Sequence, residues 1–458
     1  MTRTIYLWSL AAILIFGCKE AEKPKEVEEQ APPVPSGPPP DFAVGSSDYL
    51  FNEDSLYTFE LTIHPDSLAK IDIDPAAEEY VEASLTFQGE TLNKVGVRYK
   101  GSIGAFVNCL SGQDWANPSG HKICTKLSMK VKVDWKGSDT LFYGMEKLQF
   151  HSMNYDSSKM HERLGYHLFR EMGIPSPRVV HVRVMVNGQY SGLYALVEQI
   201  DKFFIRHNYE DKGGNLYKEI WPLDQSGRAQ KPATYAEKLE TNKKKGDVTI
   251  MESFGKELAS ARTNTLKDVI SNRMNIDEIM SFIAVDRTIR ADDGPFHWYC
   301  FAGYCSNHNY YWYEKPTTET LHLLPWDLDM AFENIIDDIN PVTPVADKWG
   351  QISAECEPFP YGPWQVPQRS SACDKLTSGW IRFRDEYKVK LDEFMNGPFA
   401  EDKVDELIDR WAAQIQAANI EANELHDDAI ELNAWKGAIE TLRQRMNHAR
   451  SEYQKSVM

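Results

Sequence analysis

The chain of 458 residues has an ordinary globular composition, 42% hydrophobic and 26% charged, with enough length for two or three core units. Its formal net charge of −18 argues against a nucleic-acid-binding protein, because phosphate backbones select basic surfaces. The composition therefore indicates a folded protein of more than one lobe. Nucleic-acid binding is the one function class that it argues against.

The N-terminus has the pattern of an export signal that ends in a lipid-attachment site. Arg3 precedes an apolar run over residues 5–16, which is too short to span a membrane comfortably. The sequence Ile-Phe-Gly then precedes Cys18 and resembles the lipobox of bacterial lipoproteins, whose cysteine is acylated. We expect a lipoprotein signal peptide over 1–18 and a membrane anchor on Cys18; an ordinary signal peptide with a chance cysteine is the alternative.

Residues 19–45 are rich in Glu, Lys and Pro, cannot bury a core, and predict an extended tether ahead of the folded part. Lys19, rather than Asp, follows Cys18, which in a Gram-negative cell fits export to the outer membrane or the cell surface. We therefore expect an exported, membrane-anchored protein.

The remaining six cysteines predict three disulfides, since an even number is typical of exported chains. No C-x-x-C pair is present, and the spacings match no zinc pattern. The pairing we favour closes three local loops: Cys109 with Cys124, Cys300 with Cys305, and Cys356 with Cys373.

Short alternating runs at 56–63, 80–87 and 94–101 predict antiparallel strands. The third ends in the sequence KGSIG, where glycines would let backbone N–H groups approach an anion closely. A plain hairpin turn explains the two glycines equally well.

Residues 126–133 alternate strictly, which predicts a strand with a cationic face and a core face. Asp156 is the predicted N-cap of a helix that ends at Gly173, with Glu162 on a second, partly apolar face of it. If Glu162 points inward it needs a cation; a surface salt bridge is the alternative. Asn187-Gly188 predicts a hairpin between two long strands.

In the second half, residues 276–290 have helical periodicity and lead into carboxylates separated by apolar runs that we interpret as buried strands. These polar side chains are Asp292, Asp293, Asn309, Asp327 and Asp329. Carboxylates at the ends of apolar strands need a cation nearby, which predicts a divalent-metal and phosphate site. Residues 401–458 are expected to be helical and to pack on this second part.

Several blocks in order resemble the CotH family of spore-coat-protein-H-like atypical kinases: VRYKGS (97–102), KLSMKVKV (126–133), residues 144–177, VNGQYSGLYALVEQID (186–201), HNYYWY (308–313) and PWDLDMAF (325–332). The resemblance implies an α+β, two-lobed, atypical protein-kinase-like fold. Its β-rich N-lobe with one helix would cover 46–200, and its mainly helical C-lobe would cover 201–458.

By motif, the resemblance makes Asp293 the catalytic-loop base, although Asp292 beside it leaves that assignment open. It makes Asn309 and Asp327 metal ligands, with Asp329 as a further candidate. The nucleotide side would consist of a strand lysine, its glutamate partner and groups near the glycine turn: Lys126 or, next best, Lys130; Glu162; and Arg98, Lys100, Gly101 and Ser102.

The function implied is transfer of the γ-phosphoryl group of ATP, with Mg²⁺ or Mn²⁺, to Ser or Thr of a surface or secreted protein. The insertion between Asp293 and Asn309, with its Cys300–Cys305 pair, would shape the acceptor side. The alternative is a non-catalytic surface scaffold or adhesin that binds structural Ca²⁺ through the acidic stretch. Metal-assisted hydrolysis of a phosphate or glycan is a third hypothesis, which gives the lysine strand no role.

Overall fold

The computed structural model describes residues 41, 43, 45–101, 103–106, 108–112, 114, 117–137, 139–335, 356–361 and 365–457. The expected signal peptide, the lipidation site Cys18, most of the tether and Ser102 lie outside the described residues. No helix in the described part of the chain is both long enough and apolar enough to cross a membrane.

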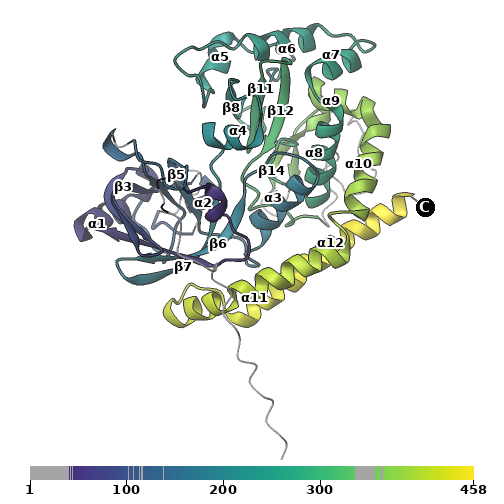
Figure 1. The fold of residues 1–458 in the computed structure, drawn as a ribbon. Coiled ribbons are helices and arrows are strands. Elements are labelled where there is room, and N and C mark those ends of the chain that lie inside the picture. Colours follow the sequence, from purple (N-terminus) through teal and green to yellow (C-terminus); the bar gives the residue numbers. More distant parts are fainter. Residues whose placement is uncertain are drawn as a thin grey trace, which may run out of the picture.

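The first part of the chain forms a closed seven-stranded barrel (Figure 1). Its strand order is β1-β2-β3-β4-β5-β7-β6, and β6 pairs with β1 in parallel to close it. The strands are β1 (Tyr57–Ile63), β2 (Val81–Phe87), β3 (Glu90–Tyr99), β4 (Met129–Lys132), β5 (Lys147–His151), β6 (Val179–Val186) and β7 (Gln189–Val197). Alternation of side chains fills the barrel with a core of its own, which includes Phe59, Phe87 and Phe150.

Local sequence signals explain several elements of the barrel. Asn187 and Gly188 join β6 to β7 and both have positive φ, 51° and 76°, as a two-residue hairpin of this sequence requires. Helix α1 (Pro65–Ile73) follows β1 and is capped by the His64 side chain, which accepts from Asp66 N–H. The predicted strand 126–133 is shorter in the structure, because only β4 pairs with both neighbours and Lys126 precedes it.

Helix α3 (His161–Glu171) lies between the barrel and the second part of the chain, and it begins five residues later than the predicted N-cap. Lys159 has a φ of 66°, so the chain cannot enter a helix directly after Asp156. The carboxylate of Asp156 instead accepts from the N–H groups of Ser158 and His161, both at 2.8 Å.

The second part of the chain combines helices with two small sheets. It therefore contains more β-structure than the expected mainly helical lobe. One sheet has the order β12-β11-β8 and the other β10-β9-β14-β13. The strands are β8 (Leu216–Lys218), β9 (His297–Phe301), β10 (Tyr304–Ser306), β11 (Tyr310–Lys315), β12 (Thr320–Pro325), β13 (Phe359–Tyr361) and β14 (Val366–Ser370). The helices are α4 (Lys202–Asn208), α5 (Pro232–Glu237), α6 (Thr249–Ser260), α7 (Leu266–Arg273), α8 (Ile276–Ile289), α9 (Lys375–Trp380) and α10 (Arg384–Asn396).

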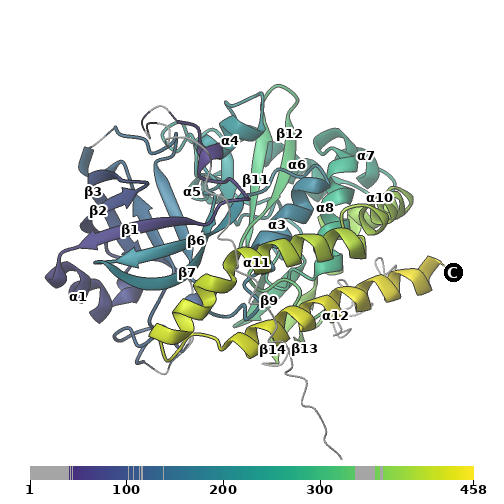
Figure 2. The ribbon, with the colours of Figure 1, turned by 60° about the horizontal axis from the view of Figure 1, so that its bottom comes forward.

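The last two helices, α11 (Glu401–Leu425) and α12 (Leu432–Val457), run along one side of the molecule (Figure 2). Contrary to expectation, α11 packs on the barrel as well as on the second part. Arg183 of β6 makes a two-pronged ion pair with Glu421, and Arg163 of α3 donates to Gln414 at 2.7 Å. Helix α11 therefore ties the barrel to the helical part.

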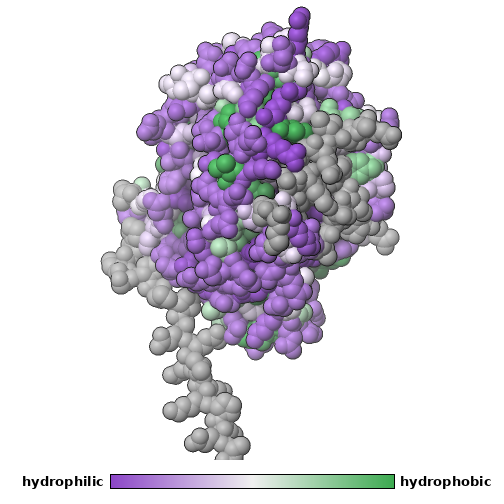
Figure 3. Space-filling model, turned by 90° about the vertical axis from the view of Figure 1, so that its right-hand side faces the viewer, coloured by the Kyte–Doolittle hydropathy of each residue, from purple (hydrophilic) through white to green (hydrophobic). Residues whose placement is uncertain are grey.

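The face shown in Figure 3 is mostly hydrophilic, and its hydrophobic areas are small and separated. The large hydrophobic side chains that are exposed in the described chain come from separate elements: Ile73, Ile123, Tyr155, Phe301, Tyr304, Met330, Val389 and Leu425.

Glu314 in β11 generates a stability prediction. Its carboxylate is buried and accepts from Tyr217 Oη–H at 2.8 Å, and burial raises its pKa to about 7. The folded state thus holds a proton that the unfolded chain loses above pH 4.5, so this group's contribution to stability falls as pH rises toward 7. Glu314→Gln is expected to raise the free energy of unfolding by about 2 kcal/mol at pH 8 and little at pH 5, measured by urea denaturation.

The control is Glu237→Gln at the exposed end of α5, which should show no such pH dependence. An equal effect of Glu314→Gln at both pH values would contradict the assignment.

Candidate functional site

The outer surface of β3, β4 and β5 carries a cluster of cations toward the second part of the chain. Arg98 pairs with Lys130 and Lys130 with Gln149, so these side chains share the face opposite the barrel core. Burial is the main cause that lowers the pKa of Lys130 to about 7, and the positive charges of its neighbours lower this pKa further. We call the barrel residues Arg98, Lys100, Lys130 and Lys147, together with Lys218 of β8 in the second part of the chain, the lysine face.

Lys100, His151 and Glu162 form a chain of hydrogen bonds from the lysine face to α3, and its inner members His151 and Glu162 are buried. Lys100 Nζ donates to His151 Nε2 at 2.5 Å, and His151 Nδ1–H donates to the Glu162 carboxylate at 2.8 Å. Burial lowers the pKa of His151 well below its usual range, and the charge of Lys100 acts in the same direction. A neutral imidazole therefore bridges the amino group of Lys100 and the carboxyl group of Glu162, and Glu162 does point inward.

Burial also raises the pKa of Glu162 well above its usual range, the charge of Asp327 adds to this, and Lys100 opposes it. Lys126 does not act on Glu162. Its Nζ donates to the carbonyl of Leu193 at 2.5 Å, on the other side of the barrel wall. The lysine that reaches Glu162 is Lys100, which does so through His151. Lys100 follows β3 and lies on the outer face of the barrel near β5, whereas the Lys126 side chain reaches the inner end of the barrel.

Three contacts from α3 hold the loop that carries Asp327 and Asp329. Tyr166 Oη accepts from the N–H of Asp327 at 2.8 Å, and His161 Nδ1–H donates to the carbonyl of Asp329 at 2.9 Å. Between them, Gly165 lets Leu328 approach: a Cβ at Gly165 would lie 2.9 Å from Leu328 Cδ1. Helix α3 therefore positions Glu162 and the acidic loop together.

Strand pairing brings Asn309 next to Asp327. Asn309 precedes β11 and Asp327 follows β12, and Tyr310 pairs with Pro325 in this hairpin. Both residues have positive φ, 56° and 54°, a strained conformation that is common where side chains serve a site. The N–H of Asn309 donates to Glu219 Oε1 at 3.3 Å, which adds another carboxylate to the cluster.

Asp293 lies in the same cluster. Asn309 Nδ2–H donates to Asp293 Oδ2 at 2.6 Å. Burial raises the pKa of Asp293 to about 7 and the negative charge of Asp327 adds to this, while the Asn309 hydrogen bond opposes it. Burial also raises the pKa of Asp329 well above its usual range, with Asp327 and Glu162 as the next causes. These carboxylates are near enough to repel one another.

Asp292, in contrast, faces away from this cluster into a set of hydrogen bonds. Its Oδ1 accepts from Tyr361 Oη–H at 2.9 Å, Asn334 donates to its Oδ2, and His297 Nε2 lies 3.4 Å away. With these partners Asp292 shapes the loop, and Asp293 is the carboxylate beside Asn309.

Arg98 and Gly101, two of the groups expected near the glycine turn, have local partners. Glu78 forms an ion pair with Arg98 and accepts from Gly101 N–H at 3.0 Å. A Cβ at Gly101 would lie 2.4 Å from Ala105 Cβ, so the glycine is required by the tight turn into α2 (Ile103–Phe106). The structure thus gives Gly101 a local conformational role, and Ser102 is not described.

The structure contains the three disulfides in the favoured pairing: Cys109–Cys124, Cys300–Cys305 and Cys356–Cys373. The second of them links β9 to β10, which follow Asp293 in the chain. Phe301 at the tip of this hairpin is 87% exposed.

Sequence reasoning missed His151, Glu219 and Lys218. His151 ends a buried strand, Lys218 ends the short β8 and Glu219 follows it, and no motif in the sequence distinguishes these residues. Only the pairing of β8 with β11 and of β4 with β5 brings them to the site.

Two sets of side chains could hold a metal ion. Ligand atoms of His151, Glu162 and Asp327 lie within 4.8 Å of one another. Both ring nitrogens of His151 are already hydrogen-bonded, however. The oxygen donors of Asp327, Asp329 and Asn309 suit a hard cation such as Mg²⁺ or Mn²⁺ better.

The acidic loop offers carboxylate oxygens that could ligate such an ion. Within the described residues, the carboxylates of Asp327 and Asp329 make no side-chain hydrogen bond or ion pair. Repelling carboxylates of this kind are costly without a cation. The residues present therefore fit a divalent metal.

Comparison with known proteins places the chain in a family. A family model described as CotH kinase protein matches residues 97–453, and the chain belongs to the CotH family. It is 22% identical over 281 residues to the inner spore coat protein H of Bacillus subtilis (strain 168), which covers 61% of this chain and 70% of that protein.

Among solved structures, the chain aligns with the complex of the toxin–antitoxin system proteins HipA and HipB with operator DNA from Shewanella oneidensis MR-1. The alignment covers 81% of this chain and 76% of that chain, at 12% identity and a TM-score of 0.28. We base nothing on a similarity this low.

The contact between Gly165 and the acidic loop gives a second prediction. Gly165→Leu is expected to lower the free energy of unfolding by about 2 kcal/mol, because the added side chain meets the buried Leu328. Urea denaturation measures this effect.

Gly437→Leu in α12 is the matched control, since nothing lies within 4 Å of a Cβ there and the gain in helix propensity is the same. It is expected to leave stability unchanged or to raise it by up to about 0.8 kcal/mol. Equal effects of the two substitutions would show that α3 does not press on the loop.

Proposed function

We propose that the chain is a kinase-like phosphotransferase that transfers the γ-phosphoryl group of ATP to a Ser or Thr hydroxyl of a surface or secreted protein. The observation that carries the proposal is one cluster: Lys100 is bridged to Glu162 by His151, ligand atoms of His151, Glu162 and Asp327 lie within 4.8 Å of one another, and Asn309 bonds Asp293. Phosphoryl transfer depends on such positioning and charge more than on covalent participation. The family description as a kinase protein supports it.

The lysine face is the proposed binding surface for the ATP phosphates. Burial lowers the pKa of Lys100, while the charges of Asp327 and Glu162 raise it. The His151 bridge fixes the Lys100 ammonium at the edge of the barrel, where Lys130 and Lys218 add positive charge. Phosphate oxygens would satisfy these cations, which explains why several of them are held together.

Asp293 is the proposed base for the acceptor hydroxyl. It is the carboxylate that lies beside Asn309 and near Asp327, where an acceptor hydroxyl could approach both a base and the phosphates. Asn309 holds one carboxylate oxygen in place by its hydrogen bond. Asp292 is not available for this role because its oxygens are bonded by Tyr361 and Asn334.

The divalent ion would be held by Asp327, Asp329 and the side-chain oxygen of Asn309. Bound Mg²⁺ or Mn²⁺ would neutralise the developing charge on the phosphates. The chain's own contribution is to present these oxygens from one rigid hairpin and one loop that α3 fixes.

The proposed place of action is outside the cytoplasm, with the chain anchored through a lipid on Cys18. The lipobox-like sequence and the tether suggest this arrangement. The three disulfides support it, because they persist mainly in oxidising compartments.

The first functional prediction concerns Asp327. The melting temperature of the full chain is expected to rise with ATP and Mg²⁺ or Mn²⁺ together, with a stabilisation of about 2.7 kcal/mol when the ligand is at a hundred times its dissociation constant. Asp327→Asn should abolish this shift in a thermal-denaturation series.

Asp268→Asn, on the exposed side of α7, is the control and should keep the shift. Stabilisation by Ca²⁺ alone, with no phosphoryl transfer from ATP to a general acceptor protein, would instead favour the scaffold hypothesis.

The second functional prediction separates Lys100 from the rest of the cationic surface. Lys100→Met is expected to lower nucleotide affinity at least about tenfold, because it removes a partner of the phosphates. Lys132→Met, one row along β4 and half-exposed, should change affinity by less than about twofold. Fluorescence titration with a labelled ATP analogue measures both, and equal losses would contradict the role of Lys100.

A further inference from the structure

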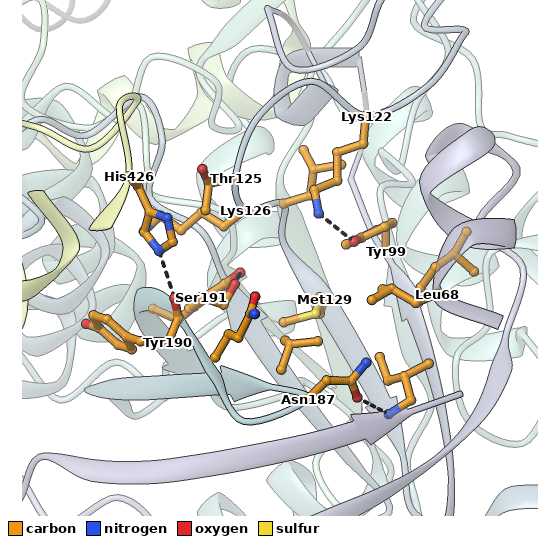
Figure 4. A pocket seen from close by; sticks show the side chains of 16 residues that line it. Leu68, Tyr99, Lys122, Thr125, Lys126, Met129, Asn187, Tyr190, Ser191 and His426 are labelled. Carbon is orange, nitrogen blue, oxygen red and sulfur yellow. Dashed lines mark hydrogen bonds between the residues drawn. The ribbon is translucent and has the colours of Figure 1, made fainter. Parts of the chain in front are cut away.

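A hollow lies at the end of the barrel, on the inner side of the wall whose outer surface carries the lysine face. Its volume is about 340 Å³, and it is lined by the end of β1, by α1, by the segment before β4 and by the β6–β7 hairpin (Figure 4). Lys126 lines it, whereas neither Lys100 nor any carboxylate of the acidic cluster does. It is therefore a site separate from the proposed phosphotransfer site.

The hollow has an apolar side and a polar side. Ile63, Leu68 and Ile71 come from β1 and α1, whereas Thr125 and Ser191 come from the opposite side. Figure 4 shows Leu68 across the hollow from Thr125 and Ser191. A ligand that fits must itself have an apolar body and a polar end.

Two lysines line the hollow. Lys122, near Leu68, donates to Tyr99 Oη at 3.0 Å and forms an ion pair with Asp72, whereas Lys126 is the cation on the side of Thr125 and Ser191. Lys126 Nζ donates to the carbonyl of Leu193 at 2.5 Å and lies 5.0 Å from the centre of the Tyr194 ring. No carboxylate of the described residues forms an ion pair with it. Burial lowers its pKa well below the usual range, with the charge of Lys159 next, and only Asp428 acts in the opposite direction. An anionic ligand in the hollow would supply the ion-pair partner that Lys126 lacks among the described residues, and it would favour the charged form of the lysine.

The surrounding chain makes room for this lysine. Gly192 has a φ of 131°, and a Cβ there would lie 3.3 Å from Lys126 Cδ. Asp428, which follows α11, accepts from Thr125 N–H through its Oδ2 at 2.7 Å, so its charge acts on Lys126 without a direct ion pair between them in the described chain. That bond and the bond between His426 and the carbonyl of Tyr190 place the α11–α12 connection over the hollow.

We propose that this hollow is a binding site for a small amphiphilic carboxylate, whose acid group pairs with Lys126 and whose alkyl chain packs on the β1–α1 side. At roughly 30 Å³ for each water-sized group, about 340 Å³ holds on the order of ten non-hydrogen atoms. That is the size of a medium-chain fatty acid such as octanoate. Ser191 and Tyr194 hydroxyls, bonded to each other at 3.1 Å, flank the acid end.

The test is isothermal titration calorimetry of the full chain with sodium octanoate and, as the uncharged probe of the same length, octanol. Octanoate is expected to bind more tightly than octanol. Lys126→Met should weaken octanoate binding at least about tenfold and change octanol binding by less than about twofold. Absence of octanoate binding to the unmodified chain, or equal binding by Lys126→Met, would overturn the proposal.

Leu68→Trp is the second variant, since Leu68 is only partly buried on α1 and Lys126 remains intact. The larger side chain should fill the apolar side and weaken both probes at least about tenfold, with the circular dichroism spectrum unchanged. This variant keeps the proposal testable if Lys126→Met does not fold. Undiminished octanoate binding by a folded Leu68→Trp would show that the ligand lies elsewhere.

Discussion

The interaction on which the rest of the site depends is the bridge Lys100–His151–Glu162. It joins the outer surface of the barrel to α3 by two hydrogen bonds, at 2.5 and 2.8 Å. Because His151 and Glu162 are buried, removal of either would leave a polar partner unsatisfied at a cost of about 1–3 kcal/mol. The bridge thus fixes how far α3 stands from the lysine face, and with it the loop that α3 holds.

The acidic side is built by a different device. The β11–β12 hairpin and the loop after it bring Asn309 and Asp327 side by side, and both take left-handed backbone conformations. Burial, and after it the charge of Asp327, raises the pKa of both Asp293 and Asp329, so the cluster holds an excess of negative charge. A divalent cation and the opposing lysines are complementary to that excess of negative charge. This complementarity underlies the proposed phosphotransfer activity in a member of the CotH family.

The long α11 gives the two cores a common support. Its contacts with Arg163 and Arg183 connect α3 and the barrel to the C-terminal part of the chain. The connection that follows α11 also covers the hollow that contains Lys126. Helix α11 and the connection after it therefore contact both α3 and the hollow, although the two sites lie on opposite sides of the barrel wall.

Sequence alone determined the local elements: the alternating strands, the Asn187-Gly188 hairpin, α8, the C-terminal helices and the loop-closing disulfide pairs. Each follows from short-range periodicity, turn chemistry or spacing. It also drew attention to Glu162, Asp293, Asn309 and Asp327, whose residue types suit metal and phosphate chemistry, and the family resemblance gave them roles.

Tertiary structure decided which of these groups meet. It places Lys100 rather than Lys126 in the bridge with Glu162, because the closed barrel puts Lys100 outside and Lys126 at its inner end. It separates Asp292 from Asp293 by what each hydrogen-bonds, and it adds His151. Strand pairings and helix packing between distant segments set these distances, and no local pattern encodes them.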